Sequence, residues 1–224
     1  MIDKRVTTTQ AALAGLHDGA SLMLSGFGGA GFPVALVRAV ERLGVCDLTL
    51  IMNTLRFVET YAPLLFEERR VRRAVCSAAR GRGERPSSFE RQLFAGELEI
   101  ELVPQGTFSE RVRAGGAGIP AFYTPAGVGT PLAEGRETRN FDGRLYLLET
   151  SLRADFALIR GHRADRWGNV IFTGSQMNFA HAMATAAQIT VVEVDRIEDE
   201  PLPPNAIDIP GIYVQRVIAL DDER

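Results

Sequence analysis

Apolar residues gather in short continuous runs along the chain, and seven of these runs are rich in Val, Ile and Leu. The runs are Ala20–Leu24, Leu48–Met52, Ala74–Cys76, Leu98–Val103, Phe156–Ile159, Ile189–Val194 and Tyr213–Ala219. An apolar run without alternation is typical of a strand that is covered on both faces, as the strands of parallel sheets are. The pattern therefore predicts seven buried strands.

Segments with helical spacing of apolar residues stand between several of these runs. They are Val34–Leu43, Phe89–Leu93 and Ala180–Ala187. Pro33 comes just before the first segment, where its missing N–H costs nothing, and Gly44 follows the end of that segment. The alternation of strands and helices predicts an α/β fold with an open, mainly parallel sheet and helices on both faces.

Two segments lack either pattern and are predicted to be loops. Arg80–Pro86 is charged and is punctuated by Gly and Pro, so we expect it to face solvent. Gly115–Thr130 is too rich in Gly and Pro for a regular helix or a central strand, and its Phe122 and Tyr123 favour an ordered, packed loop. The composition shows no clear boundary, so we expect residues 1–224 to form a single domain.

Composition and charge narrow the classes of function. The chain has 224 residues and a formal net charge of -3, so it carries no surplus of positive charge for a nucleic acid partner. No apolar stretch reaches the roughly 20 residues of a membrane span, and no membrane association is expected. Cys46 and Cys76 fit neither a disulfide framework nor a zinc spacing, which predicts a reducing cytoplasm.

Ser25–Pro33 follows a predicted strand and opens the first predicted helix. Three of its glycines have the G-x-G-x-x-G spacing of a dinucleotide-binding turn. Such proteins hold a ribose hydroxyl with an acidic residue at the end of the second strand. Here Asp47 precedes the second strand, and the far end of that strand carries Asn53. An NAD-binding oxidoreductase is therefore an alternative that lacks its confirming residue.

The same glycine-rich segment has two further interpretations. Its backbone N–H groups at a helix N-terminus can approach an anion or a thioester closely, or the segment is a plain strand-to-helix turn. Gln105 follows another predicted strand, at the end where open α/β sheets bind ligands. Its amide can donate to a developing oxyanion or be a solvated turn amide. Asn53 is open to the same two interpretations.

Histidines form no recognisable site in the sequence. His17, His162 and His181 lie far apart without metal-ligand spacing, so no metal site is predicted and each is expected to be structural or exposed. Cys76 ends an apolar run and is interpreted as a buried small hydrophobic residue.

Three longer segments form a pattern of their own: Glu97–Thr130, Ala154–Asn169 and Ala184–Val194. Together they resemble the type I CoA-transferases, specifically the A-type (alpha) subunit of the 3-oxoacid and acetoacetate class. The resemblance runs from about Lys4 to Ala219 and is strongest in the first of the three segments. The resemblance implies a CoA-transferase fold, which is related to the α/β folds of sugar-phosphate isomerases.

The resemblance also implies a reaction that two subunits share. A glutamate that the partner beta subunit supplies attacks an acyl-CoA and becomes a glutamyl-CoA thioester. CoA then passes from a donor such as succinyl-CoA or acetyl-CoA to a 3-oxoacid such as acetoacetate or 3-oxoadipate. The glutamine of the family's PQG motif matches Gln105, which is expected to donate to the oxyanion.

The implied assembly is a hetero-oligomer with the beta subunit, such as α2β2, and the chain is expected to be active only in it. No metal or redox cofactor is required by this chemistry. The residues expected to line the cleft for the acyl-CoA and the carboxylic acid are Ser25, Gly26, Phe27, Gly28, Gly29, Gly31, Asn53 and Gly106.

Two segments depart from the family pattern. Thr54–Arg56 stand where many relatives have a second asparagine followed by Ala-Gly, so the identity of the acid stays open. In Met177–Ala180 only Asn178 and Phe179 of the family pattern remain, in a structural turn or at a contact between subunits. A non-catalytic ligand-binding module of the same fold is a further alternative, because fold alone does not determine activity.

The catalytic glutamate of the family belongs to the beta subunit, and nothing in this chain resembles its motif. Glu90, Glu110 and Glu149 are therefore expected to be surface or structural residues and not nucleophiles.

Overall fold

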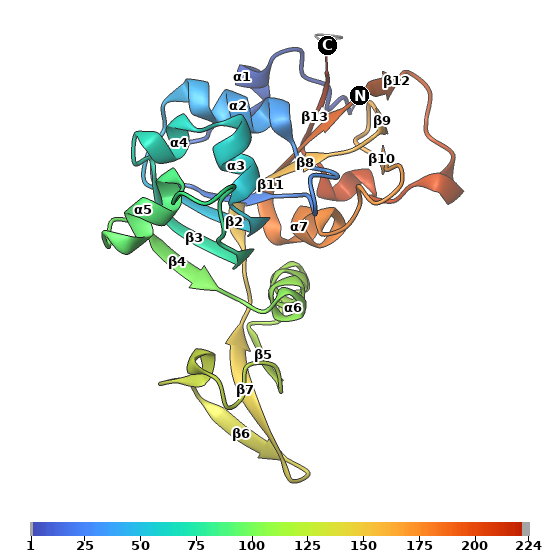
Figure 1. The fold of residues 1–224 in the computed structure, drawn as a ribbon. Helices are drawn as coiled ribbons and strands as arrows, with labels where there is room; N and C mark the ends of the chain where they lie inside the picture. The colour runs from blue at the N-terminus through green and yellow to red at the C-terminus, as the bar shows by residue number, and fades with distance from the viewer. Residues whose placement is uncertain (1, 221–224) are drawn as a thin grey trace.

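The computed structural model describes residues 2–220 and is built around a seven-stranded sheet (Figure 1). Neighbouring strands are all parallel, in the order β13-β11-β8-β1-β2-β3-β4. Their bounds are β1 (Ser21–Leu24), β2 (Leu48–Thr54), β3 (Val71–Ala78), β4 (Glu99–Leu102), β8 (Ala154–Arg160), β11 (Ala187–Val194) and β13 (Arg216–Ala219). Each of the seven predicted apolar runs forms one of these strands, which confirms the predicted sheet. The prediction that all seven are buried is wrong for β4, whose residues are exposed or half-buried because β4 has a neighbouring strand on one side only.

Helices cover both faces of this sheet and create two apolar cores. The first face carries α1 (Thr9–Ala12), α2 (Val34–Leu43), α3 (Arg56–Tyr61), α4 (Leu64–Glu67) and α5 (Ser88–Phe94), and the second carries α6 (Gln105–Gly116) and α7 (Ala180–Ala186). Successive strand residues point to opposite cores, as Leu24 and Met23 do. The prediction of helices on both faces is confirmed. Within residues 2–220, no helix combines the length and apolar character that crossing a membrane requires.

The sequence pattern did not predict α6, because this helix contains three glycines. Two of them are needed for close packing: a Cβ on Gly115 would lie 1.9 Å from the Leu152 carbonyl oxygen. A Cβ on Gly116 would lie 2.0 Å from the Thr185 hydroxyl oxygen. Tertiary contacts therefore outweigh the low helix propensity of glycine here. The predicted loop Gly115–Thr130 begins, in fact, as the last turn of α6.

A small antiparallel sheet projects from the main body beyond α6 (Figure 1). Its strand order is β5-β7-β6, and a short 3-10 helix, η1, lies in the connection after β5. The bounds are β5 (Ala121–Thr124), η1 (Pro131–Ala133), β6 (Thr138–Phe141) and β7 (Arg144–Thr150). We call residues 121–150 the arm. The predicted loop thus contains an edge strand, β5, which is compatible with the exclusion of a central strand.

A third sheet, in the order β10-β9-β12, lies beyond the carboxyl ends of β8 and β11. Its strands are β9 (Arg163–Asp165), β10 (Val170–Ile171) and β12 (Arg196–Glu198), and the 3-10 helices η2 (Pro204–Ala206) and η3 (Gly211–Tyr213) follow. The buried carboxylate of Asp165 accepts backbone N–H groups of Trp167, Asn169 and Leu202. Asp165 is therefore a structural anchor for this region.

The order of the strands creates a topological switch beside β1. The chain moves outward from β1 through β2, β3 and β4, and then returns to the other side of β1 with β8, β11 and β13. We call the edge where these parallel strands end the carboxyl edge. Open α/β sheets hold ligands at this edge, outside the strands that flank the switch. The predicted glycine-rich segment follows β1 and therefore lies at this position.

Candidate functional site

The glycine turn, residues Ser25–Gly31, reverses the chain tightly at the carboxyl end of β1. The backbone N–H of Phe27 donates to the Ala30 carbonyl oxygen, and the N–H of Ala30 donates to the Phe27 carbonyl oxygen, each with an N···O distance of 3.0 Å. Gly28 and Gly29 form the exposed tip, with φ angles of 59° and 92°. Within the described residues, the N–H groups of these two glycines make no hydrogen bond. The tip can therefore donate two backbone N–H groups to a ligand.

The base of the turn is bound to the neighbouring strand through Ser25, which is 1% exposed. Its hydroxyl donates to the Gly31 carbonyl oxygen at 2.6 Å and accepts the Arg160 backbone N–H at 3.2 Å. Gly31 has a φ of 74°, and a Cβ there would lie 2.3 Å from the Gln176 carbonyl oxygen. Ser25 and Gly31 thus set the shape of the turn, and the plain-turn interpretation accounts for Gly31 through its positive φ and its close packing.

Asn178, in the segment before α7, bonds to both sides of the glycine turn. Its Oδ1 accepts the backbone N–H groups of Gly26 at 3.1 Å and Phe179 at 2.8 Å. Its Nδ2 donates to the carbonyl oxygens of Ala30 and Gln176, both at 3.0 Å. These contacts favour a structural role for the residues retained in Met177–Ala180. The resemblance drew attention to Asn178, but the sequence did not indicate which backbone groups it contacts.

Asn53 lies beside the glycine turn, as the sequence predicted. Leu24 of β1 pairs with Met52 of β2, so Asn53 lies near the end of its strand, next to the start of the turn. It is 6% exposed and, by alternation from Ile51, points toward the face that carries α6 and α7. Its amide is therefore buried beside the glycine turn and is not a solvated turn amide.

Gln105 follows β4, as the sequence predicted, and is the first residue of α6, a helix that the sequence did not predict. Gln105 and Gly106 are both exposed at the carboxyl edge. No side chain among residues 2–220 caps this terminus, and its first turn contains no acidic residue. The first N–H groups of a helix have no partner inside the helix and favour negative charge. The start of α6 can therefore bind an anion or a developing oxyanion.

Two aromatic contacts join α6 to the glycine turn. The ring centroids of Phe27 and Phe179 are 6.4 Å apart, and those of Phe179 and Phe108 are 5.5 Å apart. Phe108 lies in the first turn of α6 and is fully buried, while Phe27 is 48% exposed. Nearby, the Thr107 hydroxyl is buried without a hydrogen-bond partner in the described part of the chain. Through Phe179, the first turn of α6 is thus connected to the glycine turn.

The N-terminus of α2, which follows the glycine turn, already holds a carboxylate of this chain. Glu193 of β11 is 1% exposed, and its Oε2 accepts the Leu36 backbone N–H at 2.8 Å. Burial raises the pKa of Glu193 to about 7, although the α2 backbone N–H groups and Arg160 act in the opposite direction. Glu193 therefore occupies the start of α2, and the N–H groups that the glycine turn leaves open are those of its tip, Gly28 and Gly29.

The NAD interpretation fails on the position of its acidic residue. Asp47 is exposed in the turn that leads into β2, with a φ of 55°. That turn lies at the amino end of the strand, so the Asp47 carboxylate is at the opposite edge of the sheet from the glycine turn. It cannot hold a ribose bound at the carboxyl edge.

The other carboxylates and the buried thiol have structural environments, as expected. Glu90 completes a capping box at the start of α5, and Glu110 pairs with an arginine one turn further along α6. Glu149 is buried and pairs with an arginine of the arm at 2.6 Å. Burial raises the pKa of the Cys76 thiol to about 12, so this cysteine is not a reactive nucleophile.

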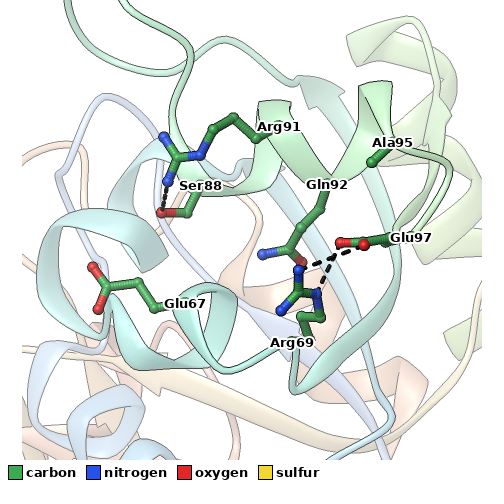
Figure 2. A pocket seen from close by; sticks show the side chains of 7 residues that line it. All are labelled: Glu67, Arg69, Ser88, Arg91, Gln92, Ala95 and Glu97. Atoms are coloured by element: carbon green, nitrogen blue, oxygen red, sulfur yellow. Dashed lines mark hydrogen bonds and ion pairs between the residues drawn. The ribbon is translucent and has the colours of Figure 1, made fainter.

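Figure 2 shows a pocket of about 500 Å³ elsewhere on the molecule. It is lined by Glu67, Arg69, Ser88, Arg91, Gln92, Ala95 and Glu97. Arg69 precedes β3 and Glu97 precedes β4, which places the pocket at the amino edge of the sheet. Arg69 pairs with Glu97 at 2.8 Å, and Arg91 donates to the Ser88 hydroxyl at 3.0 Å. The pocket is thus far from the glycine turn, and its arginines have partners within it.

Comparison with known sequences identifies close relatives. A family model described as Coenzyme A transferase matches residues 6–220. The A-type subunit of the 3-oxoadipate CoA-transferase of Pseudomonas putida is 43% identical over 221 residues, which cover 98% of this chain and 95% of that protein. The mitochondrial succinyl-CoA:3-ketoacid coenzyme A transferase 2A of Mus musculus is 46% identical over 226 residues, which cover 92% of this chain and 43% of that protein.

Comparison with solved structures gives the same fold. The acyl-CoA transferase apoenzyme from Escherichia coli O157:H7 superposes with a TM-score of 0.84 at 22% identity, over 98% of this chain and 47% of that one. This likeness confirms the α/β architecture. The chain spans less than half the length of this structure and of the mouse relative, but nearly the whole length of the bacterial subunit.

Proposed function

Because the chain belongs to the coenzyme A transferase family, we propose that it is the A-type subunit of a 3-oxoacid CoA-transferase. It works with a beta subunit to move CoA from succinyl-CoA or acetyl-CoA to acetoacetate or 3-oxoadipate. The observation that carries the proposal is the open N-terminus of α6 at Gln105, on the carboxyl edge that also holds the glycine turn. The similarity to the A-type chain of the Pseudomonas putida enzyme supports the class of substrate.

The proposed reaction proceeds by acyl exchange on a glutamate of the beta subunit. That carboxylate adds to the thioester carbonyl of the donor, and the resulting tetrahedral oxyanion collapses to a mixed anhydride and CoA thiolate. The thiolate then attacks the glutamyl carbonyl, which releases the donor acid and forms a glutamyl-CoA thioester. The acceptor carboxylate reverses these two steps and leaves as the new acyl-CoA, with the glutamate restored.

The residues of this chain stabilise charge and position the thioester. Gln105 and the first N–H groups of α6 donate to the oxyanion as its charge develops. The tip of the glycine turn, Gly28 and Gly29, allows close approach of the thioester and offers two further N–H groups. Asn53 and the following Thr54–Arg56 lie next to this turn and face the acid.

A partner subunit supplies the nucleophile in this proposal. Three carboxylates of this chain were considered as nucleophiles, and each has a structural partner: Glu90, Glu110 and Glu149. The mouse relative continues well beyond the region that matches this chain, which is consistent with a second half supplied here by a separate subunit. The chemistry requires no metal or redox cofactor, and the two free cysteines suit a reducing cytoplasm.

The test is intact-protein mass spectrometry on the isolated chain, the isolated beta subunit and the two together. Each sample is mixed with succinyl-CoA, acetyl-CoA or acetoacetyl-CoA. We expect an adduct of the mass of CoA less one water, as a glutamyl thioester requires, on the beta subunit and only when both chains are present. A matched sample with Gln105→Ala should assemble equally well and form the adduct more slowly.

If the two chains assemble but no acyl-CoA gives an adduct on either chain, the proposal is wrong. That outcome favours the non-catalytic ligand-binding module. Transfer of CoA to acetoacetate or to 3-oxoadipate in the same samples identifies the acceptor. An adduct on this chain would instead move the nucleophile from the beta subunit to the A-type subunit.

A further inference from the structure

The carboxylate of Glu193 lies where the glycine turn, α2 and two central strands meet. Its Oε2 accepts the Leu36 N–H, which belongs to the first turn of α2. In the sheet, Glu193 stands opposite Arg160 of β8, and the Glu193 carbonyl oxygen accepts the Gly161 N–H at 2.9 Å. Glu193 thus connects the start of α2 to the strands on the far side of the topological switch.

Arg160 carries this connection to the glycine turn. Its backbone N–H donates to the Ser25 hydroxyl, which in turn donates to the Gly31 carbonyl oxygen. Only Phe32 and Pro33 separate Gly31 from the start of α2. Both ends of the glycine turn are therefore fixed to the same pair of strands, one end through Ser25 and the other through Glu193.

We infer that Glu193 is a positioning residue, which holds the start of α2 so that the tip of the glycine turn stays in its ligand-binding shape. This inference rests on the proposed function in one respect, which is that the ligand of the turn is an acyl-CoA. Glu193 lies beneath α2 and does not face the open carboxyl edge, so it acts through the turn and not on the substrate.

The surroundings of Glu193 make its charge state sensitive to pH. From α2 it faces the backbone N–H groups of Val34, Ala35 and Leu36, and from β8 it faces the Arg160 guanidinium. The neighbouring strand β13 places the apolar Ile218 opposite it. The Arg160 guanidinium also pairs with Asp195, which bonds to His162. Because Arg160 is shared with Asp195, it only partly offsets the effect of burial on Glu193. Glu193 therefore changes charge in the neutral pH range.

The experiment compares Glu193→Ala and Glu193→Gln with a buried control, Glu149→Gln, in the full chain. Hydrogen exchange read by mass spectrometry follows residues 26–36, and steady-state kinetics with the beta subunit give KM and kcat for acyl-CoA. Glu193→Ala should speed exchange of residues 26–36 by about tenfold, because a lost helix cap weakens the first turn by this order. KM should rise by a similar factor, with a smaller change in kcat.

Glu193→Gln should restore slow exchange, because its amide oxygen can still accept the Leu36 N–H. Once exchange rates are divided by the intrinsic rates at each pH, Glu193→Gln should also remove the pH dependence of the protection of residues 26–36 between pH 5 and 8, a change that a purely steric role would not produce. Glu149→Gln, in the arm, should leave the exchange of residues 26–36 unchanged.

Unchanged exchange and unchanged KM in Glu193→Ala would overturn the inference, as would the same pH dependence in Glu193→Gln and wild type. If Glu193→Ala does not fold, the pH profile of protection in Glu193→Gln still tests the role of Glu193. A wild-type complex that transfers no CoA would refute the proposed function, while the exchange data would still test the role of Glu193.

Discussion

The N-termini of α2 and α6 both lie at the carboxyl edge of the main sheet, and they differ in what occupies them. The first turn of α2 binds the buried Glu193 carboxylate, which comes from a strand of the same chain. The first turn of α6 has no capping side chain and starts with the exposed Gln105. Of the two positive helix ends, only that of α6 is available to an external anion.

In the sequence, one glycine-rich motif suggests both a turn that binds an anion and a helix terminus that binds an anion. In the structure these two features belong to different elements. The turn before α2 looks like an anion-binding loop, but the helix that follows contributes its N–H groups to the protein interior. What the turn contributes is its own exposed tip at Gly28 and Gly29. The open helix terminus belongs to α6, a helix that the sequence pattern did not predict.

The largest expected effect comes from Gln105→Ala at the open terminus. Removing one preorganised oxyanion donor lowers turnover by about 10²–10³. The melting temperature and assembly with the beta subunit should stay near wild type, because the Gln105 side chain is exposed. Steady-state kinetics on the purified complex provide the measurement. Unchanged kcat would show that α6 does not serve the reaction.

Next in size is the contrast between Gly31→Ala and Gly28→Ala in the glycine turn. Both glycines have positive φ angles, but only the Gly31 Cβ would lie 2.3 Å from a backbone oxygen, whereas no atom lies within 4 Å at Gly28. We expect losses in the free energy of unfolding of about 3 kcal/mol for Gly31→Ala and about 1 kcal/mol for Gly28→Ala. Chemical denaturation measures both. Equal losses in the two variants would contradict the finding that Gly31 is closely packed at the base of the turn while Gly28 lies at its open tip.

A smaller effect is the pH dependence of stability at the occupied terminus. The pKa of Glu193 is about 7 in the folded chain, above its ordinary value of 4.5. The folded state therefore binds a proton that the unfolded state has released, and the resulting stabilisation is complete below about pH 4.5 and is lost as pH rises through about 7. Wild type should lose about 2 kcal/mol relative to Glu193→Gln between pH 5 and 7.5.

Denaturant titrations of both proteins across this pH range isolate the contribution of Glu193, because the other titrating groups are common to them. A constant difference between the two curves would show that Glu193 does not change protonation in this range.

The smallest expected effect is that of Thr107→Val in the first turn of α6. The Thr107 hydroxyl is buried without a partner in residues 2–220, so valine should raise the free energy of unfolding by about 1 kcal/mol. Thermal unfolding measures this gain. If the hydroxyl contacts the bound acid, KM for the acid should rise in the same variant. A clear loss of stability would show that the hydroxyl is bonded in the folded protein.

Most of the seven strands were predictable because they lie between two helical layers, and burial on both faces leaves a continuous apolar run in the sequence. The edge strand β4 is not buried in this way and carries Glu99 and Glu101 among its apolar residues. The helix α2 was predictable for a local reason, since Pro33 and Gly44 mark its two ends. The positions of Asn53 and the glycine turn then follow from the rule that parallel strands end at one edge.

Other features depend on contacts between distant residues and leave no local signal. Glu193 and Leu36 are separated by 157 residues, and Asn178 and Gly26 by 152. The glycines that weaken the helical pattern of α6 are required by its packing against Leu152 and Thr185. These parts of the fold are set by tertiary contacts. In the arm, β6 is exposed along its whole length and shows no apolar run, but the two-residue turn Asp142–Gly143, with positive φ at both residues, joins it locally to β7.

The central position of β1 has a consequence for the growing chain on the ribosome. Ser21 donates its N–H to Asp155, 134 residues later, because β8 completes the second side of β1. Until β8 has been synthesised, the half-sheet β1–β4 has β1 as an open, apolar edge that can pair with other chains. Nascent chains of this protein therefore depend on protection of that edge for most of their translation.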